Sequence, residues 1–161
     1  MKFYIVDDGY INYLKTLESK VPDNYSGKRP YIGVVLEVDG HKYLAPLTSY
    51  KEKQDRLKSS SPTIFKLHHK SDEDEKLGMI QLNNMFPVTE KVIVELDVNS
   101  QDEHYKRLLN KQYEFIKSKE SEIKKKATKL HAMIIQNKVP AFTKISCDFS
   151  LLENQYTNYT V

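Results

Sequence analysis

The sequence of 161 residues contains one cysteine, five glycines and no long apolar run. A single cysteine, Cys147, cannot form an internal disulfide, which fits a reducing compartment. No apolar stretch approaches the roughly 20 residues that a membrane helix needs. The N-terminal residues show neither the apolar core nor the cleavage site of a secretory signal. We therefore expect a cytoplasmic protein that does not act at a membrane.

Several motifs of common enzymes are also missing. None of the five glycines belongs to a GxGxxG or GxxxxGK[ST] motif, which disfavours a nucleotide-dependent kinase or ATPase. The histidines form no HExxH pair and one cysteine cannot build a zinc site, so we expect neither a metal nor another cofactor. No GxSxG motif is present, although a hydrolase triad stays open because its members meet only in space.

The charges are unevenly distributed. The formal net charge is only +3, but residues 104–138 contain ten Lys or Arg and three Glu, whereas residues 72–75 are all acidic. A local basic field suits a polyanion such as a nucleic acid. The alternative is that lysine-rich helices are simply solvated faces.

The stretch 31–51 organises the prediction of the fold. Two strand-like runs flank Asp39-Gly40, and Asp-Gly between such runs predicts a hairpin with a type I′ turn. The second strand should end near Pro46, because proline has no N–H for a strand ladder.

The remaining elements are predicted from periodicity. Strands are expected at residues 2–6, 63–67, 77–82 and 91–98, and a helix from residue 7 or 8 to before Pro22. Two helices should follow residue 102, with a break at 118–121 and an end at Pro140. Residues 52–58 could be a short helix or a loop, 68–76 a mobile polar loop separate from the strands, and 83–87 a turn region. The tail should be a strand or a short helix. The order of elements predicts one α+β domain over residues 1–161, with a twisted antiparallel sheet that forms a partly open barrel, surrounded by helices.

The end of the hairpin carries the candidate chemistry. Thr48 and Ser49 can donate hydrogen bonds to phosphate, and Lys51 can stabilise developing negative charge. Lys28 and Arg29 precede the hairpin and should approach the same end. Four tyrosines near basic residues could stack on the bases of single-stranded RNA, namely Tyr10, Tyr31, Tyr50 and Tyr105. The alternatives are a helix cap for Thr48-Ser49, half-buried core positions for Tyr10 and Tyr31, and a solvated Lys51.

Several segments in the same order resemble one family. The most specific is Gly-His-Lys-Tyr-Leu-Ala-Pro-Leu-Thr-Ser at residues 40–49. The others lie at 1–4, 10–15, 20–22, 31–38, 65–67, 77–80, 105–112 and 147–153. Together they resemble the ToxN/AbiQ/CptN endoribonuclease toxins of type III toxin–antitoxin systems, with the CptN branch as the nearest fit.

The resemblance implies a sheet similar to that of the MazF/Kid toxins and metal-independent cleavage of cellular or phage mRNA. It implies a small, repeat-encoded RNA antitoxin that folds as a pseudoknot, is processed by the toxin and inhibits it. It also implies a closed ring of three proteins and three RNAs, and phage defence by abortive infection in the bacterial cytoplasm.

The resemblance also assigns roles to residues. Thr48, Ser49 and Lys51 fall on the catalytic block, and Tyr10 matches a tyrosine of the first helix. Arg29 stands where the family has a lysine, and we assign it to phosphate binding because arginine is a poor proton donor. Tyr50 replaces a proline. The RNA-binding set comprises Tyr10, Lys28, Arg29, Tyr31, Tyr50, Tyr105, Lys106 and Lys111.

The expected reaction is attack of the RNA 2′-OH on the adjacent phosphate, giving a 2′,3′-cyclic phosphate and a 5′-OH. No general acid or base is evident in the block. The alternatives are a non-catalytic RNA-binding module on the same scaffold and a protein–protein adaptor.

Overall fold

The central hairpin forms as predicted. In the computed structural model, which describes residues 1–160, it consists of β2 (Tyr31–Val38) and β3 (His41–Thr48). Asp39 and Gly40 have φ angles of 50° and 82°, the positive values that a type I′ turn requires. β3 does not end at Pro46 but continues to Thr48, because Leu47 and Thr48 find a new pairing partner in β5 (Asp72–Gln81). Val161, the last residue of the predicted domain, lies outside the described residues.

The sheet has seven strands. The other strands are β1 (Lys2–Val6), β4 (Ile64–His69), β6 (Phe86–Val88) and β7 (Ile93–Glu95). Their order is β4-β5-β3-β2-β1-β7, and β6 pairs with β3 next to β5. All pairings are antiparallel, which confirms the predicted α+β class with an antiparallel sheet. The sheet is not closed, since β4 and β7 stand at its two ends. Its similarity to MazF/Kid stays a prediction.

The prediction of a separate polar loop at residues 68–76 is wrong. β4 and β5 form a hairpin whose turn is Lys70-Ser71, and the acidic residues 72–75 belong to β5. This part of the hairpin is largely exposed, so its strands carry no apolar alternation that the sequence could display. The predicted strand 91–98 is reduced to β7, and Pro87 lies within β6 rather than in a turn.

Within the described residues 1–160, five α-helices surround the sheet. They are α1 (Asp8–Leu17), α2 (Glu103–Ser118), α3 (Glu120–Ile135), α4 (Pro140–Thr143) and α5 (Phe149–Gln155). The side chains of Asp7, Asp102 and Asp148 cap α1, α2 and α5 by accepting a backbone N–H. The predicted break between α2 and α3 is confirmed at Lys119. Pro140 begins α4 instead of ending α3. The tail is helical, as one of the two predicted alternatives stated.

Short 3-10 helices join the main elements. They are η1 (Glu52–Arg56), η2 (Leu82–Asn84), η3 (Glu90–Val92), η4 (Val98–Ser100) and η5 (Tyr156–Asn158). η1 follows the central hairpin directly and confirms the short-helix alternative for this region. Within residues 1–160, no helix is both long and apolar enough to cross a membrane.

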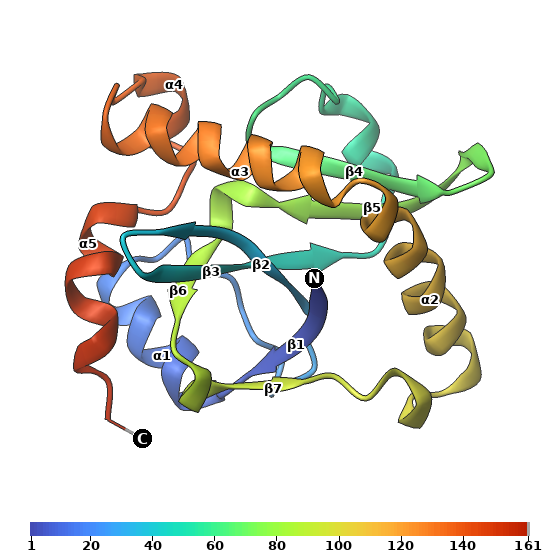
Figure 1. Cartoon of the computed structure of the whole chain (residues 1–161), viewed down its shortest axis with the longest axis horizontal. Coiled ribbons are helices and arrows are strands. Elements are labelled where there is room, and N and C mark those ends of the chain that lie inside the picture. Colours follow the sequence, from blue (N-terminus) through green and yellow to red (C-terminus); the bar gives the residue numbers. More distant parts are fainter. Residues whose placement is uncertain (161) are drawn as a thin grey trace.

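The helices cover the sheet from several sides (Figure 1). α3 lies across the sheet and packs on β2, α2 packs against β4, and α1 and α5 lie together at one end of the molecule. The buried apolar residues form one cluster that includes Leu14 of α1, Leu44 of β3, Phe86 of β6, Leu109 of α2 and Leu130 of α3. The sheet and the helices therefore share one core, which holds the strand ends in place.

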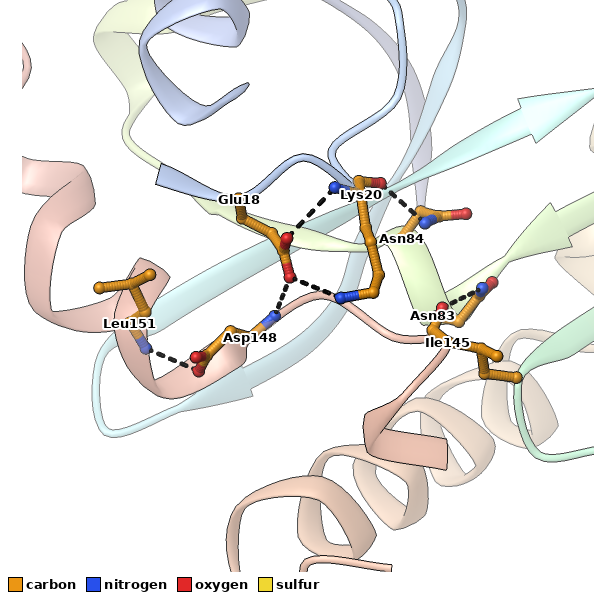
Figure 2. A network of polar contacts seen from close by, with 7 residues as sticks. All are labelled: Glu18, Lys20, Asn83, Asn84, Ile145, Asp148 and Leu151. Carbon is orange, nitrogen blue, oxygen red and sulfur yellow. Dashed lines mark hydrogen bonds and ion pairs between the residues drawn. The ribbon is translucent and has the colours of Figure 1, made fainter. Parts of the chain in front are cut away.

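A network of polar contacts fixes the C-terminal segment to the body (Figure 2). The buried Glu18 carboxylate accepts hydrogen bonds from the backbone N–H of Asp148, at 2.8 Å, and from the backbone N–H of Lys20. Asn83 and Asn84 of η2 donate their side-chain amides to the carbonyls of Ile145 and Lys20. The end of α1, the η2 turn and the start of α5 are thereby joined.

Candidate active site

The predicted catalytic block lies at the mouth of a cleft of about 210 Å³. Three parts of the chain enclose the cleft: the loop before β2, the end of β3 with the residues after it, and residues 105–112 of α2. The lining residues are Tyr25, Lys28, Arg29, Pro30, Leu47, Thr48, Ser49, Lys51, Tyr105, Leu108 and Gln112. Six predicted site residues, far apart in the sequence, are thus brought together: Lys28, Arg29, Thr48, Ser49, Lys51 and Tyr105.

Gln54 holds the end of β3 from behind. This η1 residue is only 4% exposed, and its side-chain amide donates to Thr48 Oγ1 at 3.1 Å and to the Ser49 carbonyl at 2.9 Å. Because Thr48 Oγ1 accepts from Gln54, its own proton remains available for an acceptor in the cleft. The Thr48 hydroxyl donates to the Met79 carbonyl at 3.5 Å, a long hydrogen bond that a closer acceptor in the cleft can replace. Gln54 therefore favours Thr48 as a donor toward a ligand.

Gly78 of β5 allows the end of β3 to pack closely against β5. Its φ is +124°, and a Cβ at this position would lie 1.9 Å from the Thr48 carbonyl oxygen. Any other residue here would displace the backbone of Thr48.

The loop that carries Lys28 and Arg29 is anchored by Asn24. The Asn24 amide donates to the Val6 carbonyl and to Asp8 Oδ1, and its side-chain oxygen accepts from the Tyr31 hydroxyl at 3.0 Å. The backbone N–H groups of Lys28 and Arg29 both donate to the Asn24 carbonyl at 3.2 Å. Leu47 N–H donates to the Pro30 carbonyl, which joins this loop to β3 beside the catalytic block.

The guanidinium of Arg29 has a fixed orientation. Its Nε donates to the Asp23 carbonyl at 2.7 Å, one Nη1 hydrogen approaches the Leu47 carbonyl, and its carbon lies 4.7 Å from the centre of the Tyr25 ring. Three of the five N–H donors of arginine remain for a ligand. The prediction that Arg29 approaches the end of the hairpin is confirmed.

The cleft is strongly cationic. Lys28, Arg29 and Lys51 line it, and no carboxylate does among the described residues. Burial raises the pKa of Tyr105, which lies at the opposite wall on α2 and stays a neutral phenol. The Gln112 side chain donates to the Leu77 carbonyl at 2.8 Å and so ties α2 to β5. Such a site suits an anion with hydrogen-bond acceptors, as a phosphodiester is.

Two predicted RNA contacts lie in the core instead. Tyr10 and Tyr31 are 1% and 0% exposed, and burial raises the pKa of both phenols. The Tyr10 hydroxyl donates to the Pro87 carbonyl, whereas Tyr31 holds Asn24. Neither ring offers a face on which a base could stack, so the base-stacking role predicted for them is wrong for this structure. The core alternative describes their placement.

Three other predicted RNA contacts lie outside the cleft. The Tyr50 hydroxyl donates to Asp55 Oδ2 at 2.7 Å, and both residues line a different cleft. Lys111 forms an ion pair with Glu75 at 2.9 Å, and Lys106 is half-buried on α2. Their contact with RNA stays a prediction.

Sequence reasoning missed four residues that shape the cleft: Asn24, Tyr25, Gln54 and Gly78. Tyr25 alone had a readable signal, an aromatic residue beside Lys28 and Arg29. The other three act through contacts with distant segments. Among residues 1–160, no group of three or more His, Cys, Asp or Glu side chains is arranged to hold a metal ion.

Fold and cleft together define a class: a small α+β protein that presents hydroxyl and cationic groups at a strand end, as a phosphodiester-binding protein does. Residues 2–157 match the family described as toxin ToxN, type III toxin–antitoxin system. The chain belongs to this family.

Relatives at the sequence level cover nearly the whole chain. Endoribonuclease ToxN of Pectobacterium atrosepticum is 40% identical, over 99% of this chain and 94% of its own length. Endoribonuclease ToxN of Bacillus thuringiensis subsp. kurstaki is 36% identical over 98% and 84%. Endoribonuclease AbiQ of Lactococcus lactis subsp. lactis is 32% identical over 99% and 90%.

Solved structures agree. One solved structure concerns a processed non-coding RNA that regulates a bacterial antiviral system. It superposes on this chain with a TM-score of 0.92 at 39% identity, and the match covers 100% of both chains. The structure of AbiQ, a lactococcal anti-phage endoribonuclease of the type III class, has a TM-score of 0.90 at 31% identity, over 98% of this chain and 96% of that one.

Proposed function

We propose that this protein is the endoribonuclease toxin of a type III toxin–antitoxin system and that it cleaves RNA in the cleft beside Thr48. The observation that carries the proposal is the convergence of Lys28, Arg29, Thr48, Ser49 and Lys51 on one cleft. Membership of a family whose relatives are named endoribonucleases supports it. The single buried cluster of apolar residues supports one toxin domain over residues 1–161.

The proposed reaction uses a nucleophile of the substrate. The RNA 2′-OH attacks the adjacent phosphorus, the bond to O5′ breaks, and the products carry a 2′,3′-cyclic phosphate and a 5′-OH. The proton of the 2′-OH leaves the attacking oxygen, and a proton is taken up by O5′. The protein needs only to align these atoms and stabilise the pentacoordinate anion, so no bound metal is required.

Each cleft residue has a place in this scheme. Ser49 and Lys51 are exposed and stabilise the anionic phosphorane oxygens. Thr48, whose oxygen accepts from Gln54, directs its proton to a phosphate oxygen. Arg29 and Lys28 bind the flanking phosphate, with the guanidinium held by backbone carbonyls. Among residues 1–160, no histidine lines the cleft, so alignment and charge stabilisation supply most of the rate.

The biological setting follows the relatives. A solved neighbour concerns a processed non-coding RNA that regulates an antiviral system, and another concerns selective toxin inhibition by a non-coding RNA pseudoknot. We extend this to the present chain: a pseudoknot RNA occupies the cleft and inhibits it, and the toxin processes the RNA precursor. Three proteins and three RNAs alternate in a ring in the bacterial cytoplasm. During phage infection the toxin is released from this ring and cleaves cellular or phage mRNA. The sheet curves into the partly open, MazF/Kid-like barrel.

The test is cleavage of a mixed-sequence RNA by the purified protein in EDTA, followed by analysis of the fragment ends. We expect discrete cuts with 2′,3′-cyclic phosphate. Ser49→Ala should fold normally and cleave roughly 100-fold more slowly, as for the loss of one oxyanion donor. Ser60→Ala, which removes an exposed serine outside the cleft, is the control and should cleave at the wild-type rate.

Three results would contradict parts of the proposal. Unchanged cleavage by a folded Ser49→Ala protein removes Ser49 from the mechanism. Intact RNA with salt-sensitive binding favours the non-catalytic module, and the absence of RNA binding favours the adaptor.

A further inference from the structure

A second cleft lies behind the catalytic strand end. Its volume is about 540 Å³, and its lining residues include Gln54 and Gly78. Gln54 donates to Thr48 and Ser49, and a Cβ at Gly78 would lie 1.9 Å from the Thr48 carbonyl oxygen. The backbone of Thr48 and Ser49 is therefore a wall between the two clefts, with the cationic cleft on one side and this cleft on the other.

The two clefts differ in charge. The second cleft is lined by Lys66 and Lys76 and also by Asp55 and Glu73, so its charges balance. The first cleft has three cations and no carboxylate among the described residues. A phosphate is therefore attracted to the first cleft, whereas the second suits a neutral group that carries both hydrogen-bond donors and acceptors.

An aromatic ring in the second cleft is held rigidly. The Asp55 carboxylate accepts from the Tyr50 hydroxyl at 2.7 Å through one oxygen and from Lys76 Nζ at 2.8 Å through the other. Lys76 Nζ also lies 5.3 Å from the centre of the Tyr50 ring. Because the hydrogen bond to Lys76 and the one from Tyr50 lower the pKa of Asp55, this carboxylate stays ionised and the arrangement persists at neutral pH.

Polar atoms with defined roles surround this ring. His68 Nδ1 lies 2.8 Å from the His69 carbonyl, to which it donates, so in the neutral ring Nε2 is an acceptor. The His68 ring is fixed by Phe115, with 4.2 Å between the ring centroids. Lys66 is half-buried in the same cleft and supplies N–H donors. A fixed aromatic ring, a donor and an acceptor are the groups that recognise an extruded base of single-stranded RNA.

We propose that this second cleft is a nucleobase subsite, which binds the base of the nucleotide next to the scissile phosphate and sets the cleavage sequence. The inference rests on the proposed function, since the phosphate occupies the first cleft. The volume of the second cleft lies within the roughly 300–1,000 Å³ of small-ligand sites and is sufficient for one nucleotide. Gln54 touches both this cleft and the catalytic hydroxyl, so the bound base and the reacting phosphate share one positioning side chain.

The experiment compares cleavage patterns. Wild type, Lys66→Met and Tyr50→Leu digest an RNA pool that is randomised in sequence, and sequencing of the 5′-OH ends gives the base frequencies around the cuts. We expect one position beside the cut to lose its preference in both variants, with roughly 10-fold slower cleavage of the preferred RNA, the loss expected for one base contact. Lys70→Met, on the exposed β4–β5 turn, is the matched control and should keep the preference.

A binding measurement separates this proposal from the proposed function. The probe is a set of short RNAs with 2′-O-methyl groups, which cannot be cleaved, differing in one base. If wild type prefers one base and Lys66→Met and Tyr50→Leu do not, the subsite is supported even if the natural RNA stays intact and the catalytic proposal fails. If folded variants keep the wild-type base preference in cleavage and binding, or if wild type has none, the subsite is overturned.

Discussion

Gln54 supports the geometry of the proposed catalytic block. Its amide bonds to the Thr48 hydroxyl and the Ser49 carbonyl, and it is buried. Replacing it with methionine keeps the length and removes the donor. We expect Gln54→Met to lower kcat for one RNA substrate roughly 10-fold with little change in KM, as for the loss of about 1.4 kcal/mol of positioning.

A double-mutant cycle with Thr48→Val shows whether Gln54 acts through this hydroxyl. In the Thr48→Val background, Gln54→Met should lower kcat much less than it does in the wild-type background, because the hydroxyl that Gln54 orients is already gone. Lys53→Met, an exposed change on the same 3-10 helix, is the control. Fully additive losses in kcat would show that Gln54 does not act through the Thr48 hydroxyl.

Cys147 is expected to make the free energy of unfolding depend on pH in the alkaline range. Burial, with a smaller effect of the Glu18 carboxylate, raises the pKa of this thiol to about 12. An unfolded thiol has a pKa of about 8.5, so above that pH the unfolded state loses its proton first and the native state is destabilised. We expect the stability advantage of wild type over Cys147→Ala to shrink by up to about 1.4 kcal/mol per pH unit above 8.5.

The measurement is urea unfolding of both proteins between pH 7 and 10.5. The tyrosine pKa values that burial raises affect both proteins alike, so only the difference between the two is informative. A constant difference across this range would mean that the thiol titrates normally.

β3 connects two polar networks, one at each end. Thr48 ends the strand at the cleft, and Tyr43 lies near its start, where its hydroxyl donates to Glu153 of α5. The same carboxylate oxygen lies 2.7 Å from His131 Nε2 of α3, and His131 stacks on Phe149. Glu153 thus joins β3, α3 and α5 around one half-buried acceptor.

We expect Glu153→Ala to lower the free energy of unfolding by roughly 2–4 kcal/mol, because it leaves the hydroxyl of Tyr43 and the ring of His131 buried without their partner. Glu153→Gln keeps an acceptor and should cost less. Urea unfolding gives both values. The neighbouring Asn154→Ala, an exposed change on α5, should stay within about 0.5 kcal/mol, and an equally small effect of Glu153→Ala would contradict the role of the network.

The elements that the sequence predicts well are those with strong local signals. Asp39-Gly40 specifies a turn through its backbone alone, and the apolar stripes of α2 and α3 have the helical period over many residues. The acidic half of β5 has no such signal, because its pairing with β4 and its ion pairs come from distant residues such as Lys111. The block Thr48–Lys51 could be predicted because its residue types are informative in the sequence itself. The hydrogen bonds of Gln54 and the close packing at Gly78 could not, because they depend on contacts between segments.

Several basic residues in α2, in α3 and at the junction between them have acidic partners in the fold. Lys124 pairs with Glu120, Lys119 with Glu122, and Lys111 with Glu75. These exposed pairs reduce the basic field that the count of charges suggested, and they agree with the alternative of solvated helix faces. The carboxylate-free cationic cleft is therefore the better candidate for the main contact with RNA phosphates.

Salt dependence of binding measures this contact. With a short 2′-O-methyl RNA, the logarithm of the affinity should fall linearly with the logarithm of salt concentration, and Lys28→Ala should reduce the slope by about 0.7, the value for one phosphate of a single strand. Lys144→Ala, an exposed lysine outside the cleft, should leave the slope unchanged. Equal changes in both variants would indicate that binding depends on net charge alone.

The cleft is assembled from segments spread between residues 25 and 112, with the catalytic block early and α2 last. During synthesis, the hairpin that carries Thr48 and Ser49 leaves the ribosome well before β5 and α2 can support it. Premature stop codons or frameshifts anywhere before α2 therefore yield fragments without a cleft. The cleft is thus complete only after most of the chain has been synthesised, and a single truncating mutation before α2 removes one of its walls.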